Sequence, residues 1–328
     1  MKRVVALLAA VLASAIGGCG GDGAEPGATG ATLVLDFQPN AVHTGIYAGL
    51  REGYYRDEGL DLQVREPSAS TDAPKLLAAG RAQFAILDIH DLAIAREHGL
   101  KLIGVTPIVQ RPLASVIVGD PNQVRRPREL AGRTVGVTGL PSDDAVLDSV
   151  LQSDGTDPTA VRRVTIGFQA ISALAAGKVD AATGFWNAEG VTLQRRGVPI
   201  RVFHVDRYGA PRYPELVLCT TEKLISSRPQ LVRSAVAATT RGYALAVRDP
   251  AGALSALTES VPGLDAADQR PQLDALLKAR AFSPPGRFDL QSLRAWARWD
   301  SSHEIVTRRP AIRNSFWTAA EPRAAQTG

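Results

Sequence analysis

The sequence predicts an α/β fold of two lobes with a helical segment at its C-terminal end, and three observations support this prediction. Short apolar runs of strand length alternate with segments of helical periodicity through most of the chain, which favours mostly parallel sheets with helices on both faces. The roughly 300 residues that follow the N-terminal leader exceed what one core usually fills. After Cys219 only helical periodicity remains, which is typical of a segment that covers one lobe.

Residues 1–19 have the features of a lipoprotein signal peptide. Lys2 and Arg3 precede an apolar run from Val4 to Ile16, which is too short and wrongly flanked to span a bilayer. The following Ile16-Gly17-Gly18-Cys19 resembles the bacterial lipobox, so Cys19 is the expected lipidation site and membrane anchor. Gly, Ala, Asp, Glu and Pro predominate in residues 20–31, which predicts a flexible tether.

The body of the chain is expected to contain the following elements, in order. The predicted strands are Leu33–Leu35, Leu60–Val64, Phe84–Leu87, Leu102–Val105, Ala114–Val118, Thr134–Val137, Val164–Ile166, Ala181–Thr183, Ile200–Phe203 and Leu216–Cys219. Helices between strands are predicted at Asp72–Ala79, Leu92–His98, Ala145–Gln152 and Gly190–Arg195. The C-terminal helices are predicted at Pro229–Val247, Pro250–Glu259, Asp265–Arg280 and Leu290–Asp300, and the stretch from Pro310 is expected to fray.

Composition and motifs argue against several classes of function. The formal net charge is +4 and the Arg residues are scattered among acidic ones, so nucleic acid is not an expected partner. Cys219 is the one cysteine of the predicted body, which excludes an internal disulfide and a cysteine metal cluster there. The sequence contains no Gly-rich phosphate loop, nucleophile elbow or His-Glu-x-x-His pattern. We therefore expect a binding protein without cofactor or metal, and not an enzyme.

A polar and aromatic loop follows the first predicted strand. The apolar run Leu33–Leu35 stops abruptly, and helical spacing resumes after the loop. Open α/β sheets bind ligands at the carboxyl ends of their strands. The candidate binding residues of this loop are Asp36, Phe37, Asn40, His43 and Tyr47.

The chain also contains an internal echo. Leu77–Ala85 and Leu174–Ala182 both read as a helix that ends at glycine, then a basic residue, then a strand. The first copy runs into Asp88-Ile89-His90 and the second into the stretch from Phe185 to Glu189. These two loops could face each other across a cleft. The alternative is that this common α/β unit has no functional meaning.

Five motifs, in this order and spacing, resemble a solute-binding protein of the thiamine-precursor family. This family includes bacterial pyrimidine-binding lipoproteins of ABC importers and fungal pyrimidine synthases, and the resemblance extends from about Leu33 to Asp300. The motifs are Asp36-Phe37-Gln38-Pro39-Asn40 with His43 and Tyr47, Gly53-Tyr54-Tyr55 through Gly59-Leu60-Asp61, Gly139-Leu140-Pro141-Ser142-Asp143, Phe185-Trp186-Asn187-Ala188-Glu189-Gly190, and Tyr213-Pro214-Glu215-Leu216-Val217.

The resemblance implies a periplasmic-binding-protein fold of type II, in which two α/β lobes are joined by two crossing strands. Lobe 1 would then comprise residues 32–118 and 213–310, lobe 2 residues 119–212, and residues 311–328 a poorly ordered tail. The crossings would fall near Ala114–Val118 and Tyr208–Leu218. A monomer is expected, with lobes that close over the solute like a hinge.

The predicted loops together carry acids, amides and aromatic rings, and none has Lys or Arg at its core. A neutral or weakly cationic ring is therefore favoured over a sulfonate, nitrate or phosphate. An aminopyrimidine fits, because its faces stack on aromatic rings and its edge matches a carboxylate. The candidate ligand-binding residues are Asp36, Phe37, Asn40, His43, Tyr47, Asp88, His90, Ser142, Asp143, Trp186, Asn187, Glu189 and Tyr213.

In the family, a glutamate at the position of Glu189 contacts the pyrimidine edge, and an aromatic residue at the position of Phe37 lies on the ring. The usual tryptophan is phenylalanine here. Structural roles remain open for several of these residues. Acids that precede helices, such as Asp88 and Asp143, can act as caps, while Trp186 can be core and His43 can be structural.

The resulting hypothesis is a lipid-anchored extracytoplasmic receptor that hands a pyrimidine of the hydroxymethyl or formylamino type to an ABC permease and its ATPase. One alternative is a receptor for another flat heterocycle, such as riboflavin or a purine. A sulfonate or nitrate receptor and a cell-surface sensor are others. A pyrimidine synthase is disfavoured, because residues 36–58 contain no lysine for a Schiff base and the family's cysteine-rich motif is absent.

Overall fold

The computed structural model describes residues 28–69 and 72–317. The predicted signal peptide, Cys19 and the tether as far as residue 27 lie outside the described residues. The end of the predicted tether is not a tether, because the first strand, β1, spans Thr29–Val34. Its first N–H, that of Thr29, donates to Gly59 O at 2.8 Å. Within the described residues, no helix combines the length and apolarity that a membrane span requires.

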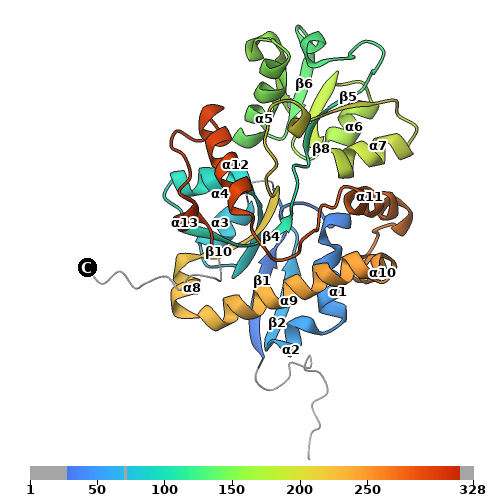
Figure 1. Cartoon of the computed structure of the whole chain (residues 1–328). Coiled ribbons are helices and arrows are strands. Elements are labelled where there is room, and N and C mark those ends of the chain that lie inside the picture. The colour runs from blue at the N-terminus through green and yellow to red at the C-terminus, as the bar shows by residue number, and fades with distance from the viewer. Residues whose placement is uncertain (1–27, 70–71, 318–328) are drawn as a thin grey trace, which may run out of the picture.

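Two five-stranded sheets form the centres of two lobes (Figure 1). The strands of the first sheet, in spatial order, are β2 (Leu60–Arg65), β1, β3 (Phe84–Asp88), β10 (Leu216–Thr221) and β4 (Leu102–Val109). Those of the second are β7 (Arg162–Thr165), β6 (Thr134–Val137), β8 (Ala181–Phe185), β5 (Ala114–Val118) and β9 (Arg201–His204). Each predicted strand overlaps one of these, so the predicted α/β class with two lobes is confirmed.

The two sheets have the same plan. Three parallel strands are followed by one antiparallel strand, which is β10 in the first sheet and β5 in the second. The chain enters each antiparallel strand from the other lobe, through residues 110–113 and residues 205–215. The expected boundary after residue 118 must be moved to before β5, because β5 pairs with β8 and β9 along its length.

Helices cover the sheets and form the C-terminal segment (Figure 1). In the first lobe they are α1 (Thr44–Arg51), α2 (Tyr54–Asp57), α3 (Asp72–Ala78) and α4 (Ile89–Glu97). In the second they are α5 (Pro141–Ser153), α6 (Ala170–Ala175) and α7 (Val191–Arg195). The C-terminal segment contains α8 (Glu222–Ser227), α9 (Pro229–Arg248), α10 (Pro250–Ser260), α11 (Ala266–Lys278), α12 (Leu290–Ser302) and α13 (Ile312–Ser315).

Acidic caps separate the C-terminal helices. The side chain of Asp249 accepts a hydrogen bond from Gly252 N at 3.0 Å at the start of α10. Asp265 and Asp289 cap α11 and α12 in the same way. An acid at this position satisfies exposed amides of the first turn and complements the helix dipole. These short-range signals explain why the helical tail could be divided correctly from the sequence.

Glycines clamp the C-terminal segment onto the first lobe. Helix α9 crosses α1 so closely that a Cβ added to Gly242 would lie 2.0 Å from Gly45 O. The ring of Tyr243 occupies the space beside Gly45, and its hydroxyl donates to Val42 O at 2.9 Å. The predicted packing of the C-terminal helices on the first lobe is therefore confirmed. Through Tyr243 and Val42, α9 also contacts the segment between β1 and α1, which lines the cleft.

Helix α11 also contacts the second lobe. Gln269 Oε1 accepts from Ala41 N at 2.8 Å on the first-lobe side. Gln272 Nε2 donates to Thr192 Oγ1 at 3.2 Å on α7, and Arg195 pairs with Asp268 at 2.9 Å. The C-terminal segment thus bridges the lobes beside the two chain crossings.

Residues 311–317 have a defined structure, which corrects the prediction that they form a poorly ordered tail. Phe316 is buried, and its ring packs where a Cβ on Gly104 would lie only 2.8 Å away. Trp317 N donates to Gly104 O at 2.8 Å, so this segment docks beside β4. The periodicity argument failed because one aromatic anchor, rather than a helical stripe, holds the segment. Residues 318–328 lie outside the described residues.

Candidate functional site

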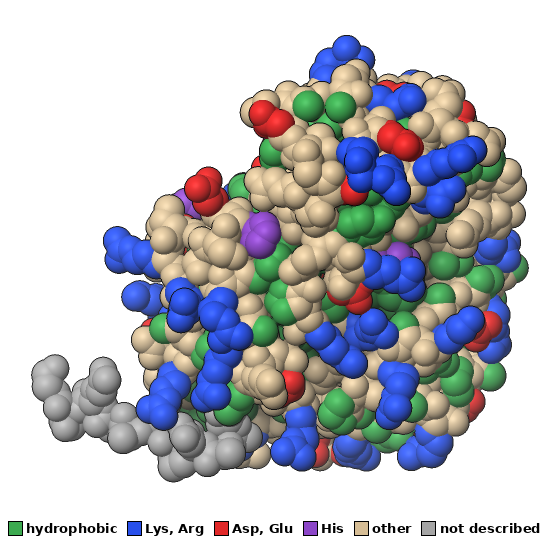
Figure 2. Space-filling view, turned by 45° about the horizontal axis from the view of Figure 1, so that its top comes forward, with side chains coloured by type: hydrophobic (Ala, Val, Ile, Leu, Met, Phe, Trp, Pro, Cys, Tyr) green, Lys and Arg blue, Asp and Glu red, His purple; other side chains and the backbone are tan. Residues whose placement is uncertain are grey.

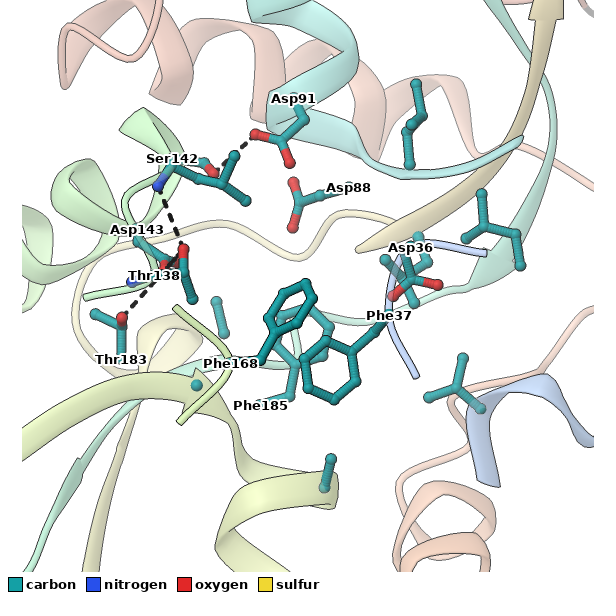
Figure 3. Close-up of a pocket in the computed structure, with 18 of the residues that line it drawn as sticks. Asp36, Phe37, Asp88, Asp91, Thr138, Ser142, Asp143, Phe168, Thr183 and Phe185 are labelled. Carbon is teal, nitrogen blue, oxygen red and sulfur yellow. Dashed lines mark hydrogen bonds between the residues drawn. The ribbon is translucent and has the colours of Figure 1, made fainter. Parts of the chain in front are cut away.

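A cleft between the lobes contains the candidate site (Figure 3). Its free space, including the mouth open to solvent, is about 920 Å³. The first lobe contributes Asp36, Phe37, Asn40, Asp88 and Asp91 to the lining. The second lobe contributes Thr138, Ser142, Asp143, Phe168, Phe185 and Glu189. These residues follow the carboxyl ends of parallel strands, where open α/β sheets place their ligands.

The first-lobe wall is formed by acids at the start of α4. Asp88 caps this helix, with its Oδ1 accepting from His90 N at 2.7 Å. Asp91 Oδ1 accepts from Ser142 Oγ at 2.9 Å, and this bond joins α4 to α5 of the other lobe. Burial raises the pKa of Asp91 to about 6. Burial and then the nearby Glu215 raise the pKa of Asp88 well above its ordinary value.

Asp143 is held rigidly in the second-lobe wall. One of its oxygens, Oδ2, accepts from Thr138 N at 3.0 Å, from the Thr138 hydroxyl and from Thr183 Oγ1 at 3.2 Å. Burial nevertheless raises the pKa of Asp143, although these hydrogen bonds lower it. The carboxylate therefore has a fixed orientation at the edge of the cleft (Figure 3).

Glu189 lies on a π-helical turn, Trp186–Gly190, that follows β8. Such turns are rare and are frequently found at functional sites. The turn lets Glu189 Oε2 accept from Phe185 N at 2.9 Å, so the side chain folds back over the end of its own strand. Burial raises the pKa of this carboxyl. Glu189 is one of the residues that line the cleft.

Three phenylalanines supply the aromatic surface of the cleft. Phe37 of the first lobe and Phe168 of the second meet edge to face, with ring centroids 4.4 Å apart and an interplanar angle of 77°. Phe185, the last residue of β8, also lines the cleft (Figure 3). The Phe37–Phe168 pair is a direct apolar contact between the lobes. Phe168 was not predicted, although a phenylalanine after Gly167 at the carboxyl end of β7 is a usable signal.

His43 and Asn40 stabilise the conformation of the loop that follows β1. His43 is fully buried and outside the lining, with Nδ1 accepting from Asn40 N at 3.1 Å. The remaining nitrogen, Nε2, therefore donates to Asp36 Oδ1 at 3.0 Å. Asn40 lines the cleft and also caps the short turn before α1, accepting from Val42 N at 2.9 Å. The structure thus gives His43 a structural role: its imidazole orients the Asp36 side chain that lines the cleft.

Several candidate residues lie outside the lining. Tyr47 packs with α9 and α10 in a separate apolar cluster. Trp186 donates its indole N–H to Pro112 O at 3.0 Å beside the chain crossing. Asn187 and Tyr213 are buried, and their side-chain polar atoms have no hydrogen-bond partner among the described residues. The structure therefore does not bring these four side chains to the cleft surface.

His90 points away from the cleft toward the C-terminal segment. Its Nδ1 lies 2.7 Å from Asp300 Oδ1 on α12, and both side chains are buried. Burial lowers the pKa of His90, but the charges of Asp300 and then Asp88 outweigh it and raise the pKa to about 9. His90 therefore lies behind the cleft surface, where it joins α4 to α12.

Glu215 is a buried acid whose importance the sequence analysis missed. It precedes β10, and its Oε2 accepts from Leu113 N and from Ala114 N at 2.8 Å. These amides belong to the first chain crossing and Glu215 to the second, so this side chain ties the crossings together. Burial raises the pKa of Glu215 to about 7. The available signal was an acid placed directly before a buried apolar strand.

The cleft has a strongly one-sided charge. Five of its described lining residues are carboxylic acids, and none of them is Lys, Arg or His. By contrast, Figure 2 shows Lys and Arg side chains spread over the outer face of both lobes. The cleft can therefore offer acceptors to a donor-rich or cationic ligand, whereas an anion would meet only like charges.

Comparison with known proteins agrees with this geometry. The family model described as NMT1/THI5 like matches residues 40–253. A formylaminopyrimidine-binding protein of Halalkalibacterium halodurans is 29% identical over 293 residues, which cover 87% of this chain and 88% of that protein.

The chain is also similar to a protein named as an enzyme and to a solved structure of low sequence identity. A 4-amino-5-hydroxymethyl-2-methylpyrimidine phosphate synthase of Legionella pneumophila is 24% identical over 236 residues, covering 71% of this chain and 74% of the relative. The solved structure of the alkanesulfonate-binding protein SsuA from Xanthomonas axonopodis pv. citri, bound to MOPS, superposes with a TM-score of 0.70 at 17% identity. It covers 90% of this chain and 99% of that one, and shows that the fold is shared.

Proposed function

Because the chain belongs to the NMT1/THI5-like family, we propose that it is the solute-binding component of an ABC importer and that it binds an aminopyrimidine between its lobes. The single observation that carries this proposal is the composition of the cleft. Carboxylates and phenylalanine rings converge there from both lobes, without a basic residue among the described lining. A flat heterocycle with amino substituents complements both features.

The aromatic surface would hold the faces of the ring. Phe37, Phe168 and Phe185 leave space for a planar group beside the acids (Figure 3). Stacking on phenylalanine needs no hydrogen-bond donor, so the substitution of phenylalanine for the family's tryptophan at position 37 is compatible with ring binding. Phe37 and Phe168 are in direct contact, with centroids 4.4 Å apart, so a ligand ring would lie beside this pair or separate the two rings.

The carboxylates would hold the edge of the ring. Glu189 and Asp143 are both oriented by hydrogen bonds from the backbone, with Phe185 N and Thr138 N as donors. A carboxylate forms two hydrogen bonds at once with an amino group and a protonated ring nitrogen, because both of these groups donate. An aminopyrimidine of the hydroxymethyl or formylamino type presents such an edge, and the pyrimidine named for the Halalkalibacterium relative supports this choice.

Transport rather than catalysis is the proposed role. None of the described lining residues is a lysine, which a pyridoxal-dependent synthase needs for its Schiff base. An ABC permease and its ATPase would receive the closed, loaded form. Anchoring to the outer side of the cell membrane through lipidated Cys19 belongs to the same proposal and rests on the lipobox-like sequence.

The proposal is tested by isothermal titration calorimetry with hydroxymethylpyrimidine, formylaminopyrimidine, riboflavin, taurine and nitrate. We expect saturable binding of an aminopyrimidine and none of taurine or nitrate. Glu189→Gln retains side-chain size and is expected to weaken pyrimidine binding at least tenfold, since about 1.4 kcal/mol corresponds to that factor. Glu222→Gln, on α8 and paired with Arg96 far from the cleft lining, is the matched control. Tight binding of taurine or nitrate without pyrimidine binding would disprove the proposal.

A further inference from the structure

A second cluster of ligating groups lies behind the cleft wall, where α4, β10 and the chain crossings meet. Asp88, His90 and Glu215 each offer one ligating atom, and these atoms all lie within 4.8 Å of one another. His90 and Glu215 have no part in the proposed pyrimidine contacts. We propose that these three side chains form a site for a divalent transition metal of the zinc type.

Unpartnered buried atoms are the first support for this site. His90 Nε2 and Glu215 Oε1 have no hydrogen-bond partner among the described residues. Both residues are almost wholly buried, with 1% and 0% of their surfaces exposed. Leaving such buried atoms without a partner destabilises the folded state. A cation between them would satisfy both at once.

The ligands are also held in orientation by further groups. His90 Nδ1 lies 2.7 Å from Asp300 Oδ1 and 3.1 Å from Trp296 Nε1. Because Nδ1–H donates to the Asp300 carboxylate, Nε2 is the nitrogen left for a metal. A carboxylate behind a ligating histidine is the usual arrangement in zinc sites, where it fixes the ring and strengthens the ligand. Glu215 Oε2 is likewise fixed by the amides of Leu113 and Ala114, which leaves Oε1 to face the cluster.

The donor set and its charge select the class of metal. Two carboxylate oxygens and one imidazole nitrogen suit Zn²⁺, whereas Ca²⁺ and Mg²⁺ prefer six or more oxygens. The ionised carboxylates of Asp88 and Glu215 carry two negative charges, which a divalent cation neutralises in this buried place. Asp88 belongs to the cleft lining as well, so the fourth position would open toward the cleft.

The position of the site gives it a mechanical consequence. Glu215 joins the first chain crossing through Leu113 and Ala114, and Asp88 ends the central strand of the first sheet. His90 links the cluster to α12 through Asp300. A bound metal would therefore brace the hinge against the C-terminal segment and raise the melting temperature of the protein.

The test is metal binding by the protein after chelation and dialysis, without pyrimidine. Titration calorimetry with ZnCl₂ should show one tight site per chain, and MgCl₂ should show none. Co²⁺ should give the intense visible absorption of a tetrahedral site in the unmodified protein, a result that needs no variant. A shared proton between Asp88 and Glu215 is the competing explanation, and absence of Zn²⁺ uptake together with a featureless Co²⁺ spectrum would establish it and overturn the proposal.

Two variants locate the site. Glu215→Gln and His90→Gln should each weaken Zn²⁺ binding at least tenfold and abolish the Co²⁺ absorption. His98→Gln is the matched control, because His98 is an exposed histidine at the other end of the same helix. Circular dichroism melting checks that each variant is folded. Equal loss in His98→Gln, or unchanged Zn²⁺ uptake in folded Glu215→Gln, would show that the metal binds elsewhere.

Discussion

The two lobes contain the same structural unit with two different endings. In the first lobe α3, Gly80 and β3 follow one another, and in the second α6, Gly177 and β8 do so. Both glycines have positive φ angles, of 70° and 63°, which close the preceding helix. Both strands hold the middle position of their sheets and end at the cleft.

The endings of the two units determine what each lobe offers a ligand. β3 runs directly into α4, whose capping residue Asp88 presents a carboxylate. β8 runs into a π-helical turn, where Phe185 faces the cleft and Glu189 folds back over it. The repeated scaffold therefore supplies two equivalent positions, and the chemistry resides in the loops that fill them. If the proposed function is correct, the acids would contact the edge of the ligand and the phenylalanines its faces.

The lobes also differ in their external support. The first lobe is clamped by α9, which crosses α1 through Gly45 and Gly242. The second lobe has no helix of comparable length among its described elements. This difference predicts that a Cβ added at the α1–α9 crossing destabilises the protein far more than a Cβ added at an uncrowded helical glycine of the second lobe.

The largest decrease in stability is expected from a substitution that disrupts the α1–α9 contact. Gly242→Ala places a Cβ 2.0 Å from Gly45 O, which is rigid backbone. We expect the free energy of unfolding to fall by about 3 kcal/mol. Gly190→Ala is the control in the second lobe, since its nearest neighbour would lie 3.7 Å away in a helical backbone. Urea denaturation of both variants measures the difference, and equal stability of the two would refute the clamp.

The next effect concerns the aromatic contact between the lobes. Phe168→Ala removes a ring from the cleft and its edge-to-face partner from Phe37. We expect pyrimidine affinity to fall by about 1–2 kcal/mol, roughly tenfold. Tyr54→Ala provides the comparison, because Tyr54 stacks on Arg241 at the first-lobe surface, outside the cleft lining. If calorimetry gives the same affinity for Phe168→Ala as for Tyr54→Ala, the ring does not contact the ligand.

A smaller effect tests the polar contact between the lobes. Ser142→Ala deletes the hydrogen bond to Asp91 Oδ1 that joins α5 to α4. Since a bond of this kind contributes about 0.5–1.5 kcal/mol, pyrimidine binding should weaken about fivefold. Ser172→Ala on α6, whose hydroxyl bonds only to Gln169, should leave binding unchanged. A faster ligand dissociation rate in Ser142→Ala alone, measured by stopped flow, would show that this bond holds the closed form together.

The smallest effect concerns pH. Burial raises the pKa of Asp143, so between its ordinary and its raised pKa the folded protein binds more protons than the unfolded chain. The free energy of unfolding should therefore gain a contribution as pH falls from neutral through the raised pKa, and lose it again as pH rises. Asp143→Asn should flatten this pH dependence of the free energy of unfolding. Denaturation curves at several pH values compare Asp143→Asn with the unmodified protein.

Part of the cleft was predictable because its signals are local. The apolar runs determine the strands, and the polar residues that directly follow them must lie at a sheet edge. Each predicted residue that lines the cleft either belongs to such a loop or starts the helix after it. These residues are Asp36, Phe37, Asn40, Asp88, Ser142, Asp143 and Glu189.

The sequence by itself determined the α/β class, the order of the elements and which loops meet at the cleft, because apolar periodicity and caps act over a few residues. Only the tertiary structure decided which side chains of a loop face inward. On α4, the three-residue spacing puts Asp88 and Asp91 on one face, whereas His90 points toward α12. Glu215 acquired its role from a crossing more than 100 positions away in the chain. Such contacts depend on how the lobes pack, and no local pattern encodes that packing.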